Sequence, residues 1–141
     1  MIVYFETSAL VKRYLVEADS SGVEALWNQA TRAVVSEILY DEMAAAFARK
    51  KLEVPAEVDS LDRAQNTFRT EWPSMRRIAL ADDIHQRVDD LLSRHPLRGS
   101  DAVHLASAIS FRDFAKQQLT FACVDHALIG AARHEGFLVA P

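Results

Sequence analysis

Two carboxylates stand directly after apolar runs that have the length of buried strands. Glu6 follows residues 2–5 (IVYF), and Asp125 follows residues 119–124 (LTFACV). In parallel sheets, ligands bind beyond the carboxyl ends of the strands, where the strand order reverses. Carboxylates gathered at that edge would bind a hard divalent cation. An acid after a strand is equally an ordinary solvated residue or helix N-cap, so both interpretations stay open at this point.

Two further acids lie on segments with helical periodicity. Glu42 lies three residues after Leu39 and four before Ala46, so it borders the apolar stripe of its helix. An acid there costs stability unless it is paired, hydrogen-bonded or bound to a cation; a salt-bridged edge residue is the alternative. Asp101 falls in the first turn of a helix, where a carboxylate favours the helix dipole without any function. His104, one turn further on, is expected to pack or hydrogen-bond rather than to bind a metal.

A competing pattern is the pair Asp82 and Asp83, which follows the apolar run 77–80. Phospho-accepting receiver domains also carry paired acids after a strand, but they place the pair after the first strand of the fold. Capping of the helix that begins here explains the pair more simply, and we favour that interpretation.

Short apolar runs alternate along the chain with longer segments of helical period. The runs that predict strands are 2–5, 33–35, 77–80, 119–124 and 137–139. The segments that predict helices are 8–16, 20–30, 37–51, 56–72, 82–94, 100–116 and 126–135. Unbroken apolar strands alternating with helices are typical of a parallel sheet covered on both faces. We therefore predict an α/β fold with right-handed crossovers.

Length and composition are those of one ordinary globular domain. The 141 residues are 50% hydrophobic and 26% charged, which fits a single domain over 1–141. A net charge of −4 gives no support to binding of nucleic acid through bulk positive charge and counts mildly against a nucleic-acid partner, but it is compatible with a local basic rim around an acidic centre. The single cysteine, Cys123, is expected to be a buried thiol in a reducing compartment. No apolar stretch is long enough to cross a membrane, so we expect a cytoplasmic protein.

Four motifs, taken in order, resemble those of a known family. They are VYFETSALVKRYL, ILYDEMAAAFAR, HPLRGSDAVHLASAI and FACVDHALIGAARHEGF. Together they resemble the PIN domain family, in particular the VapC-type toxins of bacterial toxin–antitoxin pairs, and the third motif is the closest match. The resemblance covers essentially the whole chain. It implies a three-layer α/β/α fold around a central parallel sheet of about five strands.

The resemblance also implies a function, a Mg²⁺- or Mn²⁺-dependent endoribonuclease. The acidic pocket would comprise Glu6, Glu42, Asp101 and Asp125. Glu6 and Asp101 would be the main metal ligands, and Thr7 or Ser8 would support the pocket by hydrogen-bonding a carboxylate or a metal-bound water. This set suits Mg²⁺, which favours carboxylates and keeps several waters. A divalent ion would also relieve the repulsion among four neighbouring acids.

The implied substrate is RNA, and the implied partner is a separate antitoxin that covers the acidic pocket. A metal-activated water would attack the phosphodiester in line, giving a 5′-phosphate and a 3′-hydroxyl. Basic side chains would hold the RNA backbone, with solvated helix surface as the alternative for each. The candidates are Lys12, Arg13, Arg49, Lys50 and Arg98. Relatives of this kind commonly form homodimers, and the helical hairpin around 37–72 would serve the dimer or the antitoxin.

Glu6 departs from the family pattern, in which the first acid is aspartate. The extra methylene moves the carboxylate by on the order of 1.5 Å if the backbone stays in place, and Mg²⁺ tolerates misplaced ligands poorly. Activity could therefore be intact, reduced or shifted toward Mn²⁺. The alternative function is a catalytically degenerate PIN fold that acts only as a protein- or RNA-binding module. The presence of the other three acids argues against that alternative.

Overall fold

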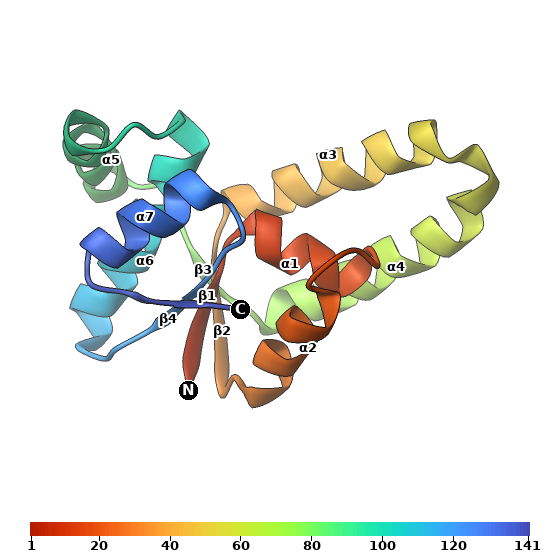
Figure 1. Ribbon diagram of the computed structural model, residues 1–141, viewed down its shortest axis with the longest axis horizontal. Helices are drawn as coiled ribbons and strands as arrows, with labels where there is room; N and C mark the ends of the chain where they lie inside the picture. The colour runs from red at the N-terminus through yellow and green to blue at the C-terminus, as the bar shows by residue number, and fades with distance from the viewer.

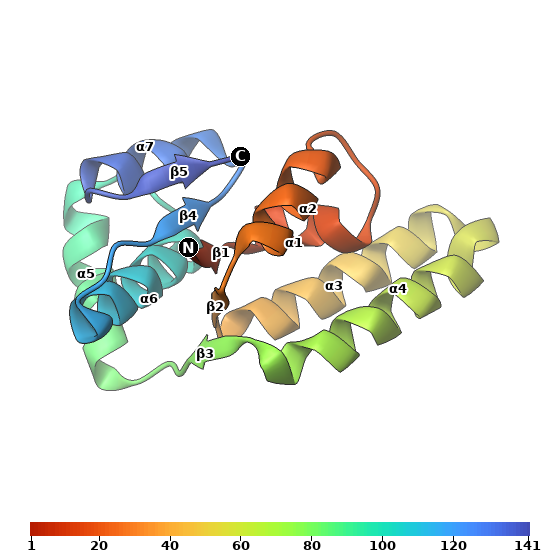
Figure 2. The same cartoon turned by 90° about the horizontal axis from the view of Figure 1, so that it is seen from below.

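The computed structural model describes residues 1–141, and its five strands form one parallel sheet (Figure 1, Figure 2). The strands are β1 (Ile2–Phe5), β2 (Arg32–Ser36), β3 (Arg76–Ile78), β4 (Thr120–Ala122) and β5 (Leu138–Ala140). Their order is β3-β2-β1-β4-β5, so the chain builds outwards from β1 to one edge and then returns to build the other side. The strand order reverses between β1 and β4, which is where ligands bind in sheets of this kind.

All five predicted strands are present, and the prediction of a parallel α/β fold is confirmed. Two strands are shorter than predicted. β3 ends at Ile78 rather than at residue 80, and β4 covers residues 120–122 rather than 119–124. β3 is an edge strand that pairs only with β2, and the exposed Leu80 lies beyond its end. Apolar character alone therefore overestimated the length of both strands.

The central strand β1 is buried on both faces, which explains its unbroken apolar sequence. Val3 and Phe5 belong to one hydrophobic core and Tyr4 to the other, because successive side chains of a strand alternate between the faces. All three are fully buried. A residue placed directly after β1 therefore lies at the middle of the sheet's carboxyl edge.

Seven helices cover the two faces of the sheet. They are α1 (Thr7–Tyr14), α2 (Ser20–Gln29), α3 (Ile38–Glu53), α4 (Val58–Glu71), α5 (Asp82–Arg94), α6 (Gly99–Ala115) and α7 (His126–His134). The first four pack on one face and the last three on the other (Figure 2), so the predicted three-layer arrangement is confirmed. None of the helices combines the length and apolar character needed to span a bilayer.

Helices α3 and α4 form a hairpin that projects away from the sheet (Figure 1). An aromatic group of Tyr40, Phe68 and Trp72 holds its base, with ring centroids 5.3–5.8 Å apart. Towards the tip, Lys51 pairs with Asp62 at 2.6 Å, and Leu52 is 83% exposed. The hairpin therefore has a packed base and an open tip.

Asp82 and Asp83 form the first turn of α5, and both are exposed. They follow the edge strand β3 rather than the strands at which the sheet order reverses. Their position agrees with the favoured interpretation as acids at a helix start, where they complement the dipole.

Candidate active site

Glu6 lies at the carboxyl end of the central strand and is itself the N-cap of α1. Its backbone N–H donates to the carbonyl of Ala122 in β4 at 3.0 Å, which holds it between the two strands. Its Oε2 accepts a hydrogen bond from Ser8 N at 2.9 Å and another from the Ser8 hydroxyl. Glu6 is only 6% exposed. Of the two alternatives to a metal ligand, the interpretation of Glu6 as a helix N-cap is therefore confirmed, and its interpretation as a solvated residue is wrong.

Ser8 also connects Glu6 to the segment that follows β4. Its hydroxyl accepts from Val124 N at 3.2 Å and lies 3.7 Å from Cys123 Sγ. Cys123 is buried, as predicted. That burial, assisted by the nearby charge of Glu6, raises the pKa of the Cys123 thiol to about 12. The thiol therefore stays protonated at neutral pH and does not act as a nucleophile.

Glu42 is held by a chain of hydrogen bonds that runs into the core. Thr7 Oγ1 donates to Glu42 Oε1 at 2.8 Å, and His104 Nε2 lies 2.5 Å from the same oxygen. The other ring nitrogen, His104 Nδ1, lies 2.9 Å from the hydroxyl of Tyr4. One tautomer satisfies the chain, since Nε2–H then donates to Glu42 while Nδ1 accepts from Tyr4. His104 and Tyr4 are fully buried, so the chain anchors Glu42 to the centre of the sheet.

The Glu42 carboxyl is ionised at neutral pH. Its partial burial acts to raise the pKa, but the hydrogen bonds from His104 and Thr7 outweigh that effect and lower the pKa of Glu42 below its ordinary value of 4.5. The sequence predicted hydrogen bonding by His104 but did not connect this residue to Glu42, and it missed Tyr4 altogether. The spacing of the sequence could have indicated that His104 belongs to the site, because it lies one helical turn after Asp101 and therefore on the same face of the helix.

Asp101 and Asp125 share one guanidinium, that of Arg98. Asp101 is 5% exposed at the start of α6, and its Oδ2 accepts from both the backbone N and the Nε of Arg98 at 3.2 Å. Arg98 Nη2 lies 3.7 Å from Asp125 Oδ2. Asp125 also caps α7 by accepting from Leu128 N at 3.0 Å. Arg98, whose side chain is 75% exposed, is therefore a counter-ion of two site carboxylates, and its contact with RNA stays a prediction.

Arg13 does not face the site. Its guanidinium pairs with Glu71 at 3.0 Å and with Glu24, and it stacks over the ring of Trp27 at 4.4 Å. The side chain is 16% exposed. The charge of Arg13 therefore joins helices α1, α2 and α4 in this structure, and its contact with RNA stays a prediction.

A groove of about 270 Å³ leads away from the acids between α1 and α3. It is lined by Thr7, Ser8, Val11, Glu42, Ala45, Ala46 and Arg49. A second hollow of about 230 Å³ shares Arg49 and continues to Lys50. Arg49 is exposed and forms no ion pair, whereas Lys12 pairs with Glu17 at 3.3 Å. Of the predicted basic residues, Arg49 and Lys50 therefore line a path to the acids.

The structure gathers the four predicted acids around the point of strand reversal. Glu6 and Asp125 follow the adjacent strands β1 and β4. Thr7, the residue directly after Glu6, donates to Glu42, and Arg98 pairs with both Asp101 and Asp125. No three of these carboxylates bring oxygens within 4.8 Å of one another. The donor atoms are all oxygens, which suits a hard divalent cation that takes one or two carboxylates and keeps several waters.

Similarity to the sequences of known proteins assigns this chain to a protein family. The sequence profile of the PIN domain matches residues 3–113. Ribonuclease VapC45 from Mycobacterium tuberculosis is 35% identical over 140 residues, which cover 99% of this chain and 95% of that protein. The chain therefore belongs to the PIN domain family, and within it to the VapC type.

Solved structures share the fold. The crystal structure of VapC20 from Mycobacterium tuberculosis, a sarcin–ricin loop cleaving toxin, matches with a TM-score of 0.70 at 17% identity and covers 100% of both chains. VapBC2 from Rickettsia felis, solved with a DNA fragment from its promoter, matches with a TM-score of 0.66 at 14% identity and covers 99% of this chain and 97% of that one. At these identities the likeness is one of fold, and it confirms the predicted PIN-like architecture.

Proposed function

We propose that this chain is a metal-dependent endoribonuclease and the toxin of a type II toxin–antitoxin pair. The family supports this function, since a relative of nearly the same length is a VapC ribonuclease. The observation that carries the proposal is the position of the acids, since Glu6 and Asp125 lie just after the two strands at which the sheet order reverses. Glu42 and Asp101 are brought to the same edge by α3 and α6.

Glu6 and Asp101 would be the principal metal ligands, with Asp125 and the ionised Glu42 completing the pocket. Protein donors bond Glu6 through Oε2 and Glu42 through Oε1, so the second oxygen of each carboxylate is left for a metal or its waters. A bound Mg²⁺ or Mn²⁺ would lower the pKa of a water and neutralise charge on the scissile phosphate. The Arg98 guanidinium contacts both oxygens of Asp101, so it would have to release at least one of them for this carboxylate to hold a metal.

The remaining residues of the site position the acids and the RNA. Ser8 fixes the orientation of Glu6, and the Thr7 and His104 donors fix that of Glu42. Arg49 and Lys50 lie along the groove between α1 and α3 and would hold phosphates of the strand on its way to the acids. This arrangement puts positive charge beside the reaction centre without making the whole protein basic.

The partner that we propose is an antitoxin, because a toxin–antitoxin complex from Klebsiella pneumoniae shares the fold with a TM-score of 0.58. A homodimer is a second proposed contact. The open tip of the α3–α4 hairpin offers apolar surface for either contact, since Leu52 is 83% exposed there.

The test is cleavage of RNA by purified, partner-free protein with Mg²⁺, with Mn²⁺ and with EDTA. Asp101→Ala, purified identically, is the negative control, and Glu6→Asp tests the unusual first acid. We expect cleavage that requires metal and disappears in Asp101→Ala. Activity that appears only in Glu6→Asp would mean an intact scaffold disabled at its first ligand. If neither the parent nor Glu6→Asp cleaves RNA, the nuclease proposal is abandoned in favour of a protein- or RNA-binding module.

A further inference from the structure

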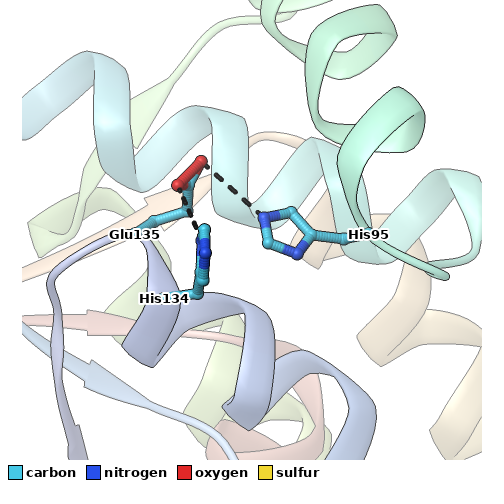
Figure 3. A group of neighbouring side chains, drawn as sticks. All are labelled: His95, His134 and Glu135. Carbon is cyan, nitrogen blue, oxygen red and sulfur yellow. Dashed lines mark ion pairs between the residues drawn. The ribbon is translucent and has the colours of Figure 1, made fainter.

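A second group of ligand-type side chains lies where the C-terminal ends of α5 and α7 meet (Figure 3). His95 directly follows α5, His134 is the last residue of α7, and Glu135 follows it. The ligand atoms of the three side chains all lie within 4.8 Å of one another. His95 Nε2 lies 3.8 Å from Glu135 Oε1, and His134 Nδ1 lies 3.8 Å from Glu135 Oε2. Both imidazoles therefore approach the same carboxylate.

The donor set differs in kind from that of the acidic pocket. Two imidazoles and one carboxylate are the ligands of three-residue zinc sites, which keep a fourth position open for water. Imidazole suits zinc and the later transition metals, whereas Mg²⁺ prefers oxygen ligands. The three side chains can thus select an ion that the acidic pocket does not favour.

The surroundings also favour a cation. Two helix C-termini converge on the group, and each carries partial negative charge from its unpaired carbonyls. The His95 and Glu135 side chains are sheltered, at 9% and 13% exposure, while His134 is 71% exposed and leaves a way in from solvent. Arg112 Nη1 donates to the Glu135 carbonyl at 2.7 Å and so fixes the backbone that carries the carboxylate.

One residue competes for the same carboxylate. Arg94 contacts both oxygens of Glu135, with Nη2 at 2.5 Å from Oε1 and Nη1 at 3.1 Å from Oε2. Arg94 Nη1 also lies 3.5 Å from His95 Nε2. The guanidinium has a second partner, however, because Asp90 lies 2.8 Å away one turn earlier on α5. Arg94 can therefore release Glu135 and keep an ion pair.

We propose that His95, His134 and Glu135 bind one Zn²⁺ ion that joins the ends of α5 and α7, with Arg94 as its internal competitor. The site is separate from the acidic pocket, because Asp125 caps the opposite end of α7. A helix of nine residues is about 13 Å long. The ion would act as a cross-link between the ends of α5 and α7, in place of the Arg94–Glu135 ion pair that connects them in this structure.

The experiment is a calorimetric titration of tag-free, full-length protein with Zn²⁺ in the presence of excess Mg²⁺, which is added to compete for the acidic pocket. We expect one Zn²⁺ per chain. His134→Ala should weaken Zn²⁺ binding by more than about tenfold. Loss of a residue that only supports a metal ligand already weakens binding by about this factor, and His134 would be a ligand itself. His85→Ala is the matched control, because His85 is an exposed histidine on α5 outside the group. His134 is itself exposed, so its loss leaves the fold intact.

Two further readouts decide the proposal. Arg94→Gln removes the competitor and should tighten Zn²⁺ binding. Zn²⁺ should raise the thermal unfolding temperature of the parent and of His85→Ala but not that of His134→Ala. The proposal is overturned if the parent binds no Zn²⁺ under these conditions, or if His134→Ala binds it as tightly as His85→Ala does.

Discussion

The two ends of α7 carry opposite chemistry. At its start, Asp125 caps the helix in a pocket of carboxylates and hydroxyls; at its end, His134 and Glu135 meet His95 and Arg94. The helix dipole favours negative charge at the first end and positive charge at the second. The difference shows that clustering alone does not choose an ion, because oxygen donors favour Mg²⁺ or Mn²⁺ and imidazoles favour Zn²⁺.

The largest expected effect is on RNA cleavage, and it distinguishes the acidic end of α7 from the histidine end. Asp101→Ala should reduce metal-dependent RNA cleavage by at least about a hundredfold. Loss of a residue that only supports a metal ligand reduces activity by up to about this factor, and Asp101 would be a ligand itself. The same protein should bind Zn²⁺ as the parent does, because Asp101 has no contact with the histidine group. Cleavage rates and Zn²⁺ titrations of one preparation measure both. Loss of both properties in a folded protein would mean that the two ends are not independent.

The second effect concerns the anchoring of Glu42. His104→Ala removes the buried donor to an ionised carboxylate and leaves the Tyr4 hydroxyl without its partner. We expect a loss of about 3 kcal/mol in the free energy of unfolding, since a hydrogen bond to a charged group contributes roughly 1.5–3 kcal/mol and an orphaned buried group adds a penalty. Urea unfolding measures this loss, with exposed His85→Ala as the control. A loss no larger than that of the control would contradict the network.

A smaller effect is the dependence of stability on pH. Because folding lowers the pKa of Glu42 from 4.5, the ionised carboxylate contributes stability that is present above that value and is lost as the pH falls through the lower folded pKa. The free energy of unfolding of the parent should therefore fall more steeply below about pH 4.5 than that of Glu42→Gln. Parallel profiles for the two proteins would remove Glu42 from the acid-sensitive groups.

The smallest effect tests the groove between α1 and α3. Arg49→Ala should weaken binding of single-stranded RNA a few-fold and reduce the salt dependence of the affinity by about one phosphate contact. Binding is measured in EDTA to prevent cleavage. Arg63→Ala is the control, since Arg63 is exposed on α4 and outside the groove. Equal salt slopes for the two variants would exclude the groove as the RNA path.

The sequence located every strand and every helix, because hydrophobic period is a local property that each segment carries itself. It also placed Glu6 and Asp125 at one edge, since parallel strands end on the same side of a sheet. It located the ends of β3 and β4 less well. Apolar residues continue past both strands, and only pairing with a neighbour decides where a ladder stops.

The amino-acid sequence by itself determined the layers and the positions of the acids along the chain. Only the tertiary structure decided what each acid contacts. Glu42 contacts His104 across 62 residues of sequence. Arg98 is largely exposed and nevertheless pairs with both Asp101 and Asp125. The histidine group likewise exists only where the ends of two helices converge. Local patterns specify which face of a helix is buried, whereas side-chain partners depend on how separate helices pack against one sheet.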